Sequence, residues 1–335
     1  MANVTYASAT DKGCYSYNQD RAWTGYRDGA HTVSVFDGHG TYGEEAAVAA
    51  AEYFSTGLYD DYSWPELFEN ADSYFRARLE RTLTEKRILN RKEGGGIYDL
   101  AGYPIRGGTT GSVVRIHADG AMTAAHVGDS EIRYYDVGGA AEGVGLCVDH
   151  SPNNLEEFKR IRASHPASQF LFGSPHGITT RPVFVPAAAG TWAINPAGGC
   201  QYSDVRHSWA SYFVAGGAAG REQLAMTRAL GNFHLKRHGL ISTPHVVDVD
   251  APAAASVHAL VVASDGLWDA CQYEAVGEIV HRPDLLGDAP AAAAALLEYG
   301  IRTSKQVFGG VTAHDNITVA VAYINVTGVG GSDKL

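Results

Sequence analysis

Short apolar runs that end at turn-forming residues recur along the chain and predict β-strands. Residues 32–36 (TVSVF) and 259–263 (ALVVA) are compact apolar runs, and each gives way to polar residues and a glycine. Near the middle of the chain, two runs separated by Ala-Asp-Gly at 118–120 predict a β-hairpin. The remaining predicted strands, including the two arms of that hairpin, are residues 112–117, 121–127, 131–137 and 317–324.

Other segments repeat apolar residues every three or four positions, which predicts amphipathic helices. From Trp64 onward one stripe contains Leu67, Phe68, Ala71, Tyr74, Phe75 and Leu79. Ser151 followed by Pro152 is a cap and first-turn pair, so we expect a helix to begin there and to run through Ile161. Further helices are predicted at residues 44–54 and 290–307, the second ending at Gly309 and Gly310.

The segment 164–220 differs from its surroundings. It is rich in proline, glycine, alanine, serine and aromatic residues, and it has no sustained period. Because a structureless loop of that length is improbable in a compact domain, we expect an inserted subdomain or a folded flap within a single domain of residues 1–335. Elsewhere strands and helices come in clusters, which favours an α+β fold over an alternating parallel sheet.

Composition and charge narrow the class of protein. Apolar residues make up 45% of the 335 positions and charged residues 19%, as in a globular protein with a large core. The net charge of −11 argues against nucleic acid or an anionic membrane as partner. No apolar run predicts a secretory signal or a membrane span.

The four cysteines are scattered without a CxxC pair, so neither a zinc site nor a disulfide framework is expected. A monomer in a reducing compartment, the cytoplasm or else the nucleus, is the expectation.

Aspartates stand at the ends of the predicted strands. Asp37 and Asp265 each follow an apolar run and precede a glycine, and Asp129 follows the hairpin. Asp315 precedes the last strand, and Asp20 lies in the N-terminal region. A carboxylate at a strand end has a rigid backbone behind it and solvent in front, and a set of oxygen ligands without cysteine favours Mg²⁺ or Mn²⁺. A single Asp-Gly pair is usually no more than a turn.

Seven motifs in order carry a resemblance to a known family. They are VFDGHG (35–40), GGTTGS (107–112), HVGDS (126–130), DHSP (149–152), TRALGN (227–232), ASDGLWD (263–269) and HDNITV (314–319). In sequence and spacing the set resembles the metal-dependent protein phosphatases of type 2C, over residues 8 to 325 with the interruption at 164–220. The resemblance implies two packed antiparallel β-sheets flanked by α-helices on both outer faces.

The resemblance also implies a site with two divalent cations, Mg²⁺ or Mn²⁺. Asp37 would bridge the two ions and the Gly38 carbonyl would bind one of them. Asp265 and Asp315 would be ligands of the other. Asp20 would stand behind these ligands, and Asp129 with Asp265 would hold a weaker third ion.

The implied reaction is hydrolysis of phosphoserine and phosphothreonine in proteins. A hydroxide bridging the two cations would attack phosphorus. His39 would be the general acid for the leaving alkoxide, and an imidazole pKa near 6.5 suits that role around neutral pH. GGTTGS lacks the ending of a P-loop, so we interpret it as a tightly packed strand start. Arg228 is interpreted as a structural ion-pair residue.

Several positions depart from the family pattern. Tyr15 stands where the family commonly has an arginine that binds the substrate phosphate, and Lys12 is a second candidate for that contact. Gln19 replaces an acidic residue, Glu131 an arginine and Asn232 an aspartate.

Tyr15 and Gln19 keep open the alternative of a catalytically weak member that binds phosphoproteins or partners as a regulatory module. A more distant alternative is a metal-dependent hydrolase of small phosphate esters, for which a narrow pocket formed by the segment 164–220 would be the discriminating observation. The segment 164–220 is expected to select the substrate or partner.

Overall fold

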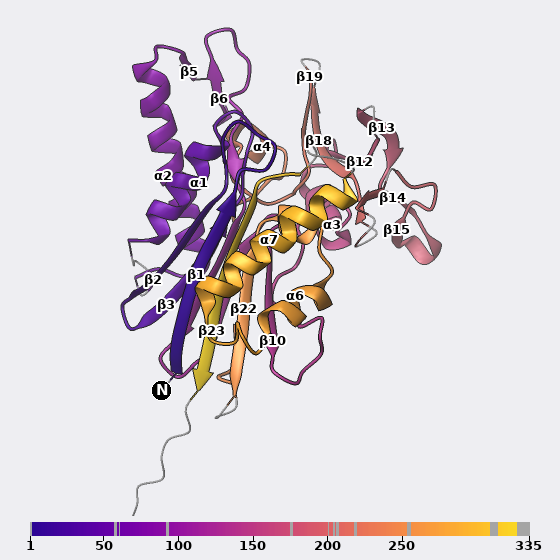
Figure 1. The fold of residues 1–335 in the computed structure, drawn as a ribbon. Coiled ribbons are helices and arrows are strands. Elements are labelled where there is room, and N and C mark those ends of the chain that lie inside the picture. The colour runs from indigo at the N-terminus through magenta and orange to yellow at the C-terminus, as the bar shows by residue number, and fades with distance from the viewer. Residues whose placement is uncertain are drawn as a thin grey trace, which may run out of the picture.

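Two five-stranded antiparallel sheets pack face to face in the computed structural model, which describes residues 2–56, 59, 61–91, 94–174, 177–199, 201–203, 205, 208–217, 220–252, 256–308 and 314–326 (Figure 1). The first sheet has the order β1 (Ala2–Asp11), β23 (Ile317–Val326), β22 (Val257–Ala263), β10 (Glu131–Asp136), β11 (Val144–Gly145). The second has the order β2 (Arg21–Arg27), β3 (Ala30–Phe36), β8 (Gly111–His117), β9 (Met122–Val127), β21 (His245–Val249).

Successive side chains on the central strands point to opposite faces of the sheet, and this divides the core into layers. On β22, Leu260 and Val262 pack between the two sheets, whereas Val261 and Ala263 face the helices outside. Both faces of the strand are therefore buried, and this is why residues 259–263 are continuously apolar rather than alternating. β23 divides its residues in the same way, with Val319 and Val321 toward the helices.

Helices cover both outer faces, as the resemblance implied (Figure 1). α1 (Gly43–Phe54) and α2 (Trp64–Glu85) lie on the second sheet, and α5 (Asp265–Trp268), α6 (Tyr273–Val280) and α7 (Ala289–Val307) lie on the first. The predicted α+β sandwich is confirmed. Among the described residues, no helix is both long enough and apolar enough to span a bilayer.

Most predicted elements are present within a few residues of their expected bounds, with one correction. Helix α3 spans Leu155–Ser164 and begins three residues later than the predicted start, because Asn154 caps it by accepting hydrogen bonds from the backbone N–H groups of Glu156 and Glu157. The Ser151 hydroxyl instead donates to the carboxylate of Asp149 in the preceding turn. Gly309 and Gly310, the predicted end of α7, lie outside the described residues.

The segment 164–220 is folded despite its irregular pattern. It contributes most of a four-stranded sheet of order β13 (Gly177–Pro182), β12 (Gln169–Ser174), β18 (Ser211–Gly217), β19 (Gly220–Leu224). We call these strands and their connections the flap. Its remaining elements are β14 (Phe184–Pro186), the short helix η2 (Ala188–Gly190), β15 (Trp192–Ile194), β16 (Gln201–Ser203) and β17 (Ser208–Trp209).

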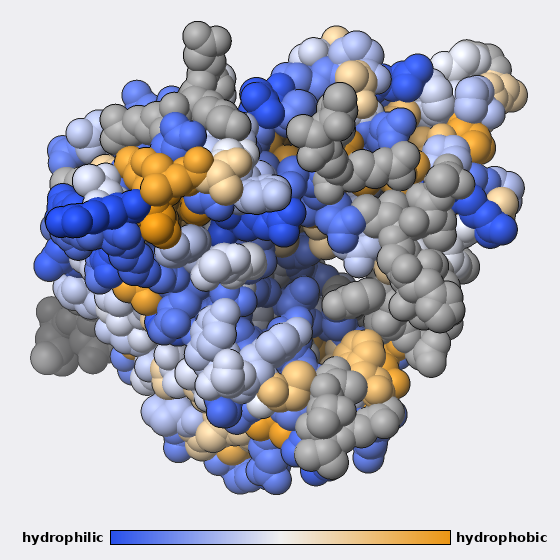
Figure 2. All heavy atoms as spheres, turned by 90° about the horizontal axis from the view of Figure 1, so that it is seen from above, coloured by the Kyte–Doolittle hydropathy of each residue, from blue (hydrophilic) through white to orange (hydrophobic). Residues whose placement is uncertain are grey.

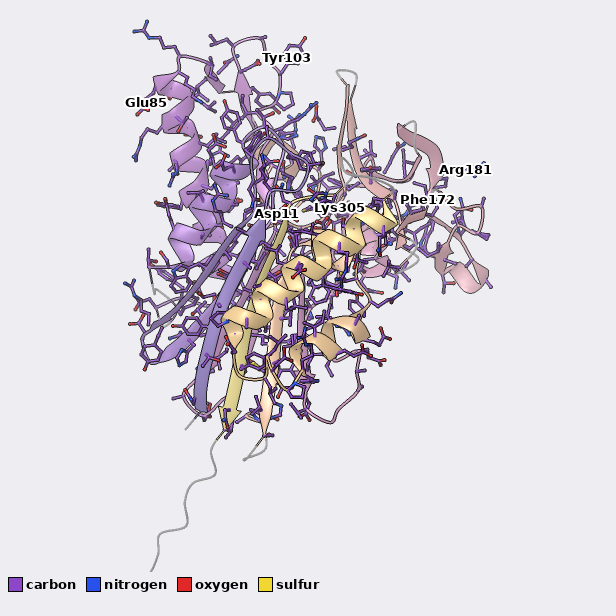
Figure 3. All side chains as sticks on the ribbon, in the orientation of Figure 1. Asp11, Glu85, Tyr103, Phe172, Arg181 and Lys305 are labelled. Atoms are coloured by element: carbon purple, nitrogen blue, oxygen red, sulfur yellow. The ribbon has the colours of Figure 1, made fainter. Side chains whose placement is uncertain are left out.

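Among the described residues, the core of the flap is shared with α3 and α4. Phe170, Phe172 and Phe213 pack in one cluster with Phe158 of α3 and with Leu235 of the short helix α4 (Phe233–Lys236). Figure 3 labels Phe172 at the junction between the flap and the rest of the molecule. Deletion of the whole segment would therefore expose α3 and α4 to water, so its function is better tested by single substitutions.

The remaining strands are short. β4 (Gly38–His39), β7 (Gly108–Thr109) and β20 (Leu230–Gly231) form a three-stranded sheet beside α1, and β5 (Leu89–Arg91) pairs with β6 (Ile97–Asp99) beyond the end of α2.

The cap of α3 gives a first test of the fold. Asn154→Ala removes a side-chain acceptor for two backbone N–H groups, so the free energy of unfolding should fall by about 1 kcal/mol. Urea denaturation measures it. Lys159→Ala, on the exposed side of the same helix, should change stability by less than about 0.5 kcal/mol. Equal effects of the two substitutions would show that Asn154 is not the cap.

Candidate active site

Five aspartates meet at one end of the sandwich because the strands that carry them end there. Ala263, at the end of β22, pairs with Glu131 on one side and with Val319 on the other. Asp265, Asp129 and Asp315 each lie within four residues of these paired positions. In the second sheet Phe36 pairs with Arg21, which places Asp37 beside Asp20. Figure 2 looks down on the molecule and shows a hollow with hydrophilic walls.

Asp37 is fixed by its own backbone. Its N–H donates to the Thr110 hydroxyl (3.0 Å), and its carbonyl accepts from the Thr110 N–H (2.9 Å) and from the Thr109 hydroxyl (2.9 Å). The Thr110 hydroxyl also bonds to that of Ser130, which follows Asp129. These three bonds use only the backbone N–H and carbonyl of Asp37, so its carboxylate remains available to a ligand.

A buried hydroxyl joins the two sheets at this end. The Ser264 hydroxyl donates to Oδ2 of Asp20 (2.8 Å) and accepts from the Thr318 N–H (3.0 Å). Asp20 is only 1% exposed, and its other oxygen, Oδ1, has no hydrogen-bond partner among the described residues.

The N-terminal loop, residues 12–19, crosses this end and is held by one asparagine. Asn316 donates from its side chain to the Lys12 carbonyl (2.7 Å) and accepts from the Gln19 N–H (2.8 Å), so it binds both ends of the loop. Gly13 has φ +61° and lies so close to Asp315 that a Cβ would stand 2.2 Å from the Asp315 carbonyl oxygen. The loop therefore lies directly against the segment that carries Asp315.

The carboxylates strongly perturb one another. Burial, followed by the charge of Asp20, raises the pKa of Asp37 well above its usual range. The pKa of Asp265 is raised by burial and then by the charge of Asp269. Burial also raises the pKa of Asp315 and brings that of Asp20 to about 6. Without added positive charge, these groups cannot all be ionised together at neutral pH.

This donor set fits divalent cations of the Mg²⁺ and Mn²⁺ type. All the donors are oxygen atoms, and Asp20 keeps a buried oxygen without a hydrogen-bond partner among the described residues. In the described part of the chain, no group of three or more Asp, Glu, His or Cys side chains is arranged so that it could hold a metal ion by itself. Backbone carbonyls and water would then have to supply further ligands, as is common for Mg²⁺. A Cβ on Gly38 would stand 2.3 Å from the Gly43 carbonyl oxygen, so only glycine fits there.

His39 lies on β4, close to Asp37, but its environment differs from the expectation. Its Nε2 is 2.5 Å from Nδ2 of Asn232, and its Nδ1 is buried without a partner among the described residues. Burial lowers the pKa of His39 to about 4, so the value near 6.5 assumed from the sequence is wrong for this protein. The imidazole is neutral at pH 7, and if the Asn232 amide donates to Nε2, the N–H is on Nδ1.

The two candidate phosphate-binding residues differ in their placement. Tyr15 lies in the N-terminal loop, with 52% of its surface exposed, and the charge of Asp315 is the largest of the causes that raise its pKa. Its phenol is therefore close to the carboxylates and open to solvent. Lys12 is also exposed, and its carbonyl holds the loop by accepting from Asn316. The structure brings Tyr15 to the site but shows no contact of the Lys12 ammonium with it.

Three residues near the carboxylates had no role in the sequence interpretation. Asp269 supplies the largest charge effect on Asp265, Ser264 bonds to Asp20, and Asn316 holds the N-terminal loop. All three lie inside the motifs ASDGLWD and HDNITV. Their place within these motifs could have identified them as candidates from the sequence. Their roles could not be predicted, because these depend on contacts with segments distant in the sequence.

The structural interpretations of two other motifs agree with their contacts. A Cβ on Gly108 in GGTTGS would stand 2.2 Å from the Asn232 amide nitrogen, so this glycine serves close packing. Arg228 forms an ion pair with Glu157 at 2.6 Å.

The departures also have structural partners. The Gln19 side chain donates to the Gly40 carbonyl (2.7 Å), and Glu131 accepts from the Tyr273 hydroxyl (2.8 Å).

Comparison with known proteins gives one consistent result. A family model described as "Protein phosphatase 2C" matches residues 8–180 and 197–306. Protein phosphatase 2C 50 of Oryza sativa subsp. japonica is 26% identical over 322 residues, which cover 87% of this chain and 68% of that protein. Probable protein phosphatase 2C 48 of the same organism is 24% identical over 316 residues, 87% of this chain and 74% of that protein.

Solved structures share the fold. Serine-threonine phosphatase 2C from Toxoplasma gondii superposes with a TM-score of 0.60 at 20% identity, covering 96% of this chain and 94% of that one. The catalytic domain of the serine threonine protein phosphatase PstP, solved in complex with 2 manganese ions, gives 0.54 at 19% identity, with 97% and 100% covered.

The crowding of carboxylates predicts a pH-dependent stability. A raised pKa means that the folded state favours the protonated Asp20, so this contribution is complete below about pH 4 and is lost as pH rises through about 6. Asn cannot ionise, so Asp20→Asn in a chelator should equal the wild type near pH 4 and exceed it by roughly 1–3 kcal/mol at pH 7. Urea denaturation across this range measures the difference.

Asp119→Asn, on the exposed turn of the hairpin, is the matched control and should show no such trend. A constant difference between Asp20→Asn and the wild type from pH 4 to pH 7 would contradict the assignment.

Proposed function

The chain belongs to the protein phosphatase 2C family of serine/threonine protein phosphatases, and we propose that its converging carboxylates hold two divalent cations, Mg²⁺ or Mn²⁺, with which it hydrolyses phosphoserine and phosphothreonine in proteins. The observation that carries this proposal is the cluster of Asp20, Asp37, Asp265 and Asp315, whose pKa values are all raised. Such a cluster is costly without cations and serves no packing purpose.

Each carboxylate has a defined part in this proposal. The charges of carboxylates from both sheets raise the pKa of Asp37, which suits a shared ligand, and the Gly38 carbonyl would add a second contact. Asp265 and Asp315 would be the ligands from the first sheet. Asp20, held by Ser264, would orient ligands from behind, and Asp129 with Asp265 would bind a weaker third ion. When bound, the cations neutralise phosphoryl oxygens and lower the pKa of bound water.

Two side chains would act on the phosphate ester itself. Tyr15 is exposed beside the carboxylates, so its phenol would donate one neutral hydrogen bond to a phosphoryl oxygen. As general acid, His39 would have to be in its imidazolium form in the complex with the phosphate dianion, whose negative charge raises the pKa of the ring, and it would give that proton to the leaving serine or threonine oxygen and become neutral again. Asn232 at Nε2 fixes the ring, so the direction of the ring N–H is set before substrate arrives.

The flap supports a role in choosing the protein substrate. Arg106 makes two 2.9 Å hydrogen bonds to the Glu222 carboxylate on β19, and the Arg106 carbonyl accepts from the Tyr42 N–H. The flap is therefore joined to the segments next to β4 and β7, where His39 lies. A substrate held by the flap would be positioned relative to the catalytic histidine.

The free thiols of Cys14, Cys147 and Cys271 support the proposal of a cytoplasmic protein.

Dependence on metal is the direct test of the proposed function. With phosphoserine or phosphothreonine peptides, turnover should require Mg²⁺ or Mn²⁺, should be abolished by chelation, and should fall by at least about 100-fold in Asp265→Asn because a ligand is lost. Phosphate release measures it. Turnover that survives chelation, or that is equal in the variant, would exclude the two-cation proposal. Peptide binding without turnover in any metal would favour the regulatory module.

The role of His39 can be separated from general damage by the choice of leaving group. His39→Ala should lower kcat for a phosphothreonine peptide by roughly 10²–10⁴-fold, because its alkoxide needs a proton. An aryl phosphate with a good leaving group needs no proton, so its kcat should fall much less. Steady-state kinetics on both substrates measures the contrast. An equal loss on the two substrates would contradict the general-acid role.

With Tyr15 in place of an arginine, we expect the affinity for the substrate phosphate to be low and to increase on substitution. Tyr15→Arg adds a charged, two-pronged donor, and a charge-assisted contact of about 1.5–3 kcal/mol corresponds to a KM lower by roughly one or two decades. Tyr17→Arg, in the same loop and also exposed, is the control for added charge. If both substitutions lower KM equally, Tyr15 has no special place at the phosphate.

A further inference from the structure

An open groove runs along helix α7 on the face of the first sheet. Its volume is about 560 Å³, and its wall is almost entirely apolar. Ala294, Leu297 and Ile301 form the helical side, and Ala9 of the edge strand β1 forms the floor. We call it the α7 groove.

The α7 groove exists because α7 has two apolar stripes. One contains Ala293, Leu296 and Gly300 and is buried against the first sheet. The second, with Ala294, Leu297 and Ile301, repeats at spacings of three and four on the neighbouring face. Leu297 and Ile301 are half-buried against the core of the first sheet, and the parts that remain exposed line the groove together with Ala294. A surface helix needs one stripe to pack on its sheet, and a second stripe at this spacing is the pattern with which a helix receives another helix.

The rim of the groove is positively charged at one end. Arg302 and Lys305 are exposed, and neither forms an ion pair with any described residue. Arg302 lies over the ring of Tyr299 at 5.5 Å, and Glu298 is the single acidic residue on the rim. In a chain with a net charge of −11, two unpaired cations beside an apolar wall are a local exception. Their complement is an apolar helix with acidic side chains.

The groove also lies close to the catalytic end. Ala9 pairs with Val319, which pairs with Ala263 at the end of the strand before Asp265. Since neighbouring strands are 4.7–4.9 Å apart, Ala9 and Ala263 are separated by about 10 Å. Figure 3 labels Asp11, where β1 leads into the N-terminal loop, and Lys305, near the end of α7; both lie toward this end.

We propose that the α7 groove docks an amphipathic, acidic helix of the phosphoprotein substrate, outside the phosphorylated segment. Apolar side chains at i, i+3, i+4 and i+7 would pack on Leu297 and Ile301, and acidic side chains would pair with Arg302 and Lys305. The proposal rests on the proposed phosphatase function. Docking at this distance raises the local concentration of the phosphorylated residue at the carboxylates and lowers KM without changing the chemistry.

Synthetic phosphopeptides test the docking. Each joins a helix, with leucines at i, i+3, i+4 and i+7 and glutamates on one flank, to a phosphothreonine segment through about ten glycine and serine residues, which span roughly 17 Å. A second peptide carries phenylalanine in place of leucine. The matched control carries alanine at those positions, which keeps the helix but removes the apolar contacts.

We expect KM for the leucine or phenylalanine peptide to be at least 10-fold lower than for the alanine control, at equal kcat. The double variant Arg302→Glu, Lys305→Glu should remove this difference and leave turnover of a small aryl phosphate unchanged. Both residues are exposed, so the variant should fold. Ile301→Glu is a second variant, and Lys159→Glu on α3 is the control for an exposed charge reversal.

Anisotropy of the fluorescent, unphosphorylated helix measures binding without turnover. If this helix binds and the double variant releases it, the docking site stands even when no phosphate is hydrolysed, and only the phosphatase proposal fails. Equal KM for all three peptides, or equal binding by wild type and double variant, overturns the docking proposal. Self-association of the protein that Ile301→Glu abolishes also overturns it, because the occupant is then a second copy.

Discussion

Mutual repulsion among buried carboxylates is the constraint on which the rest of this structure depends. Burial and like charge both disfavour the ionised forms of Asp37 and Asp265. Keeping these side chains close together therefore costs free energy, which interactions elsewhere in the fold must offset. It does so with two hydrogen-bonded sheets whose central strands are buried on both faces. A less rigid framework would relieve the repulsion by separating the strand ends.

The same constraint accounts for the groups placed around the carboxylates. Ser264 and Asn316 offer neutral hydrogen bonds, and the charges that most affect Asp37 belong to other carboxylates. A lysine or arginine among them would relieve the repulsion internally and reduce the need for a cation. In the proposed function, that positive charge comes from bound cations, so the stability of this end and the binding of cations would be parts of one equilibrium.

The sequence predicted the framework better than the flap. Apolar runs ending at Asp37 and Asp265 could be located because the strands are buried on both faces, and the family resemblance then gave the arrangement of the sheets. The sequence predicted that residues 164–220 fold as an insertion or flap, but it did not predict the strands of the flap. Their core is shared, because Phe172 and Phe213 pack on Phe158 and Leu235 outside the flap, and local periodicity cannot report such contacts. The lowered pKa of His39 escaped prediction for a similar reason, since burial is a property of the tertiary structure. The start of α3 was displaced because Asp149 binds the Ser151 hydroxyl, a competition that the capping pattern does not reveal.

The way in which Asn316 holds the N-terminal loop determines which residues of that loop can be substituted. Asn316 holds the loop through two backbone groups, the Lys12 carbonyl and the Gln19 N–H. Any amino acid supplies the carbonyl, and any except proline supplies the N–H. Between them, Gly13 is required by its close approach to Asp315 and Asn18 makes side-chain hydrogen bonds, whereas Tyr15 faces solvent. Tyr15, the proposed contact with phosphate, can then be exchanged while the carboxylates keep their places. In the proposed site, affinity for phosphate would accordingly be adjustable at this one position without rebuilding the loop.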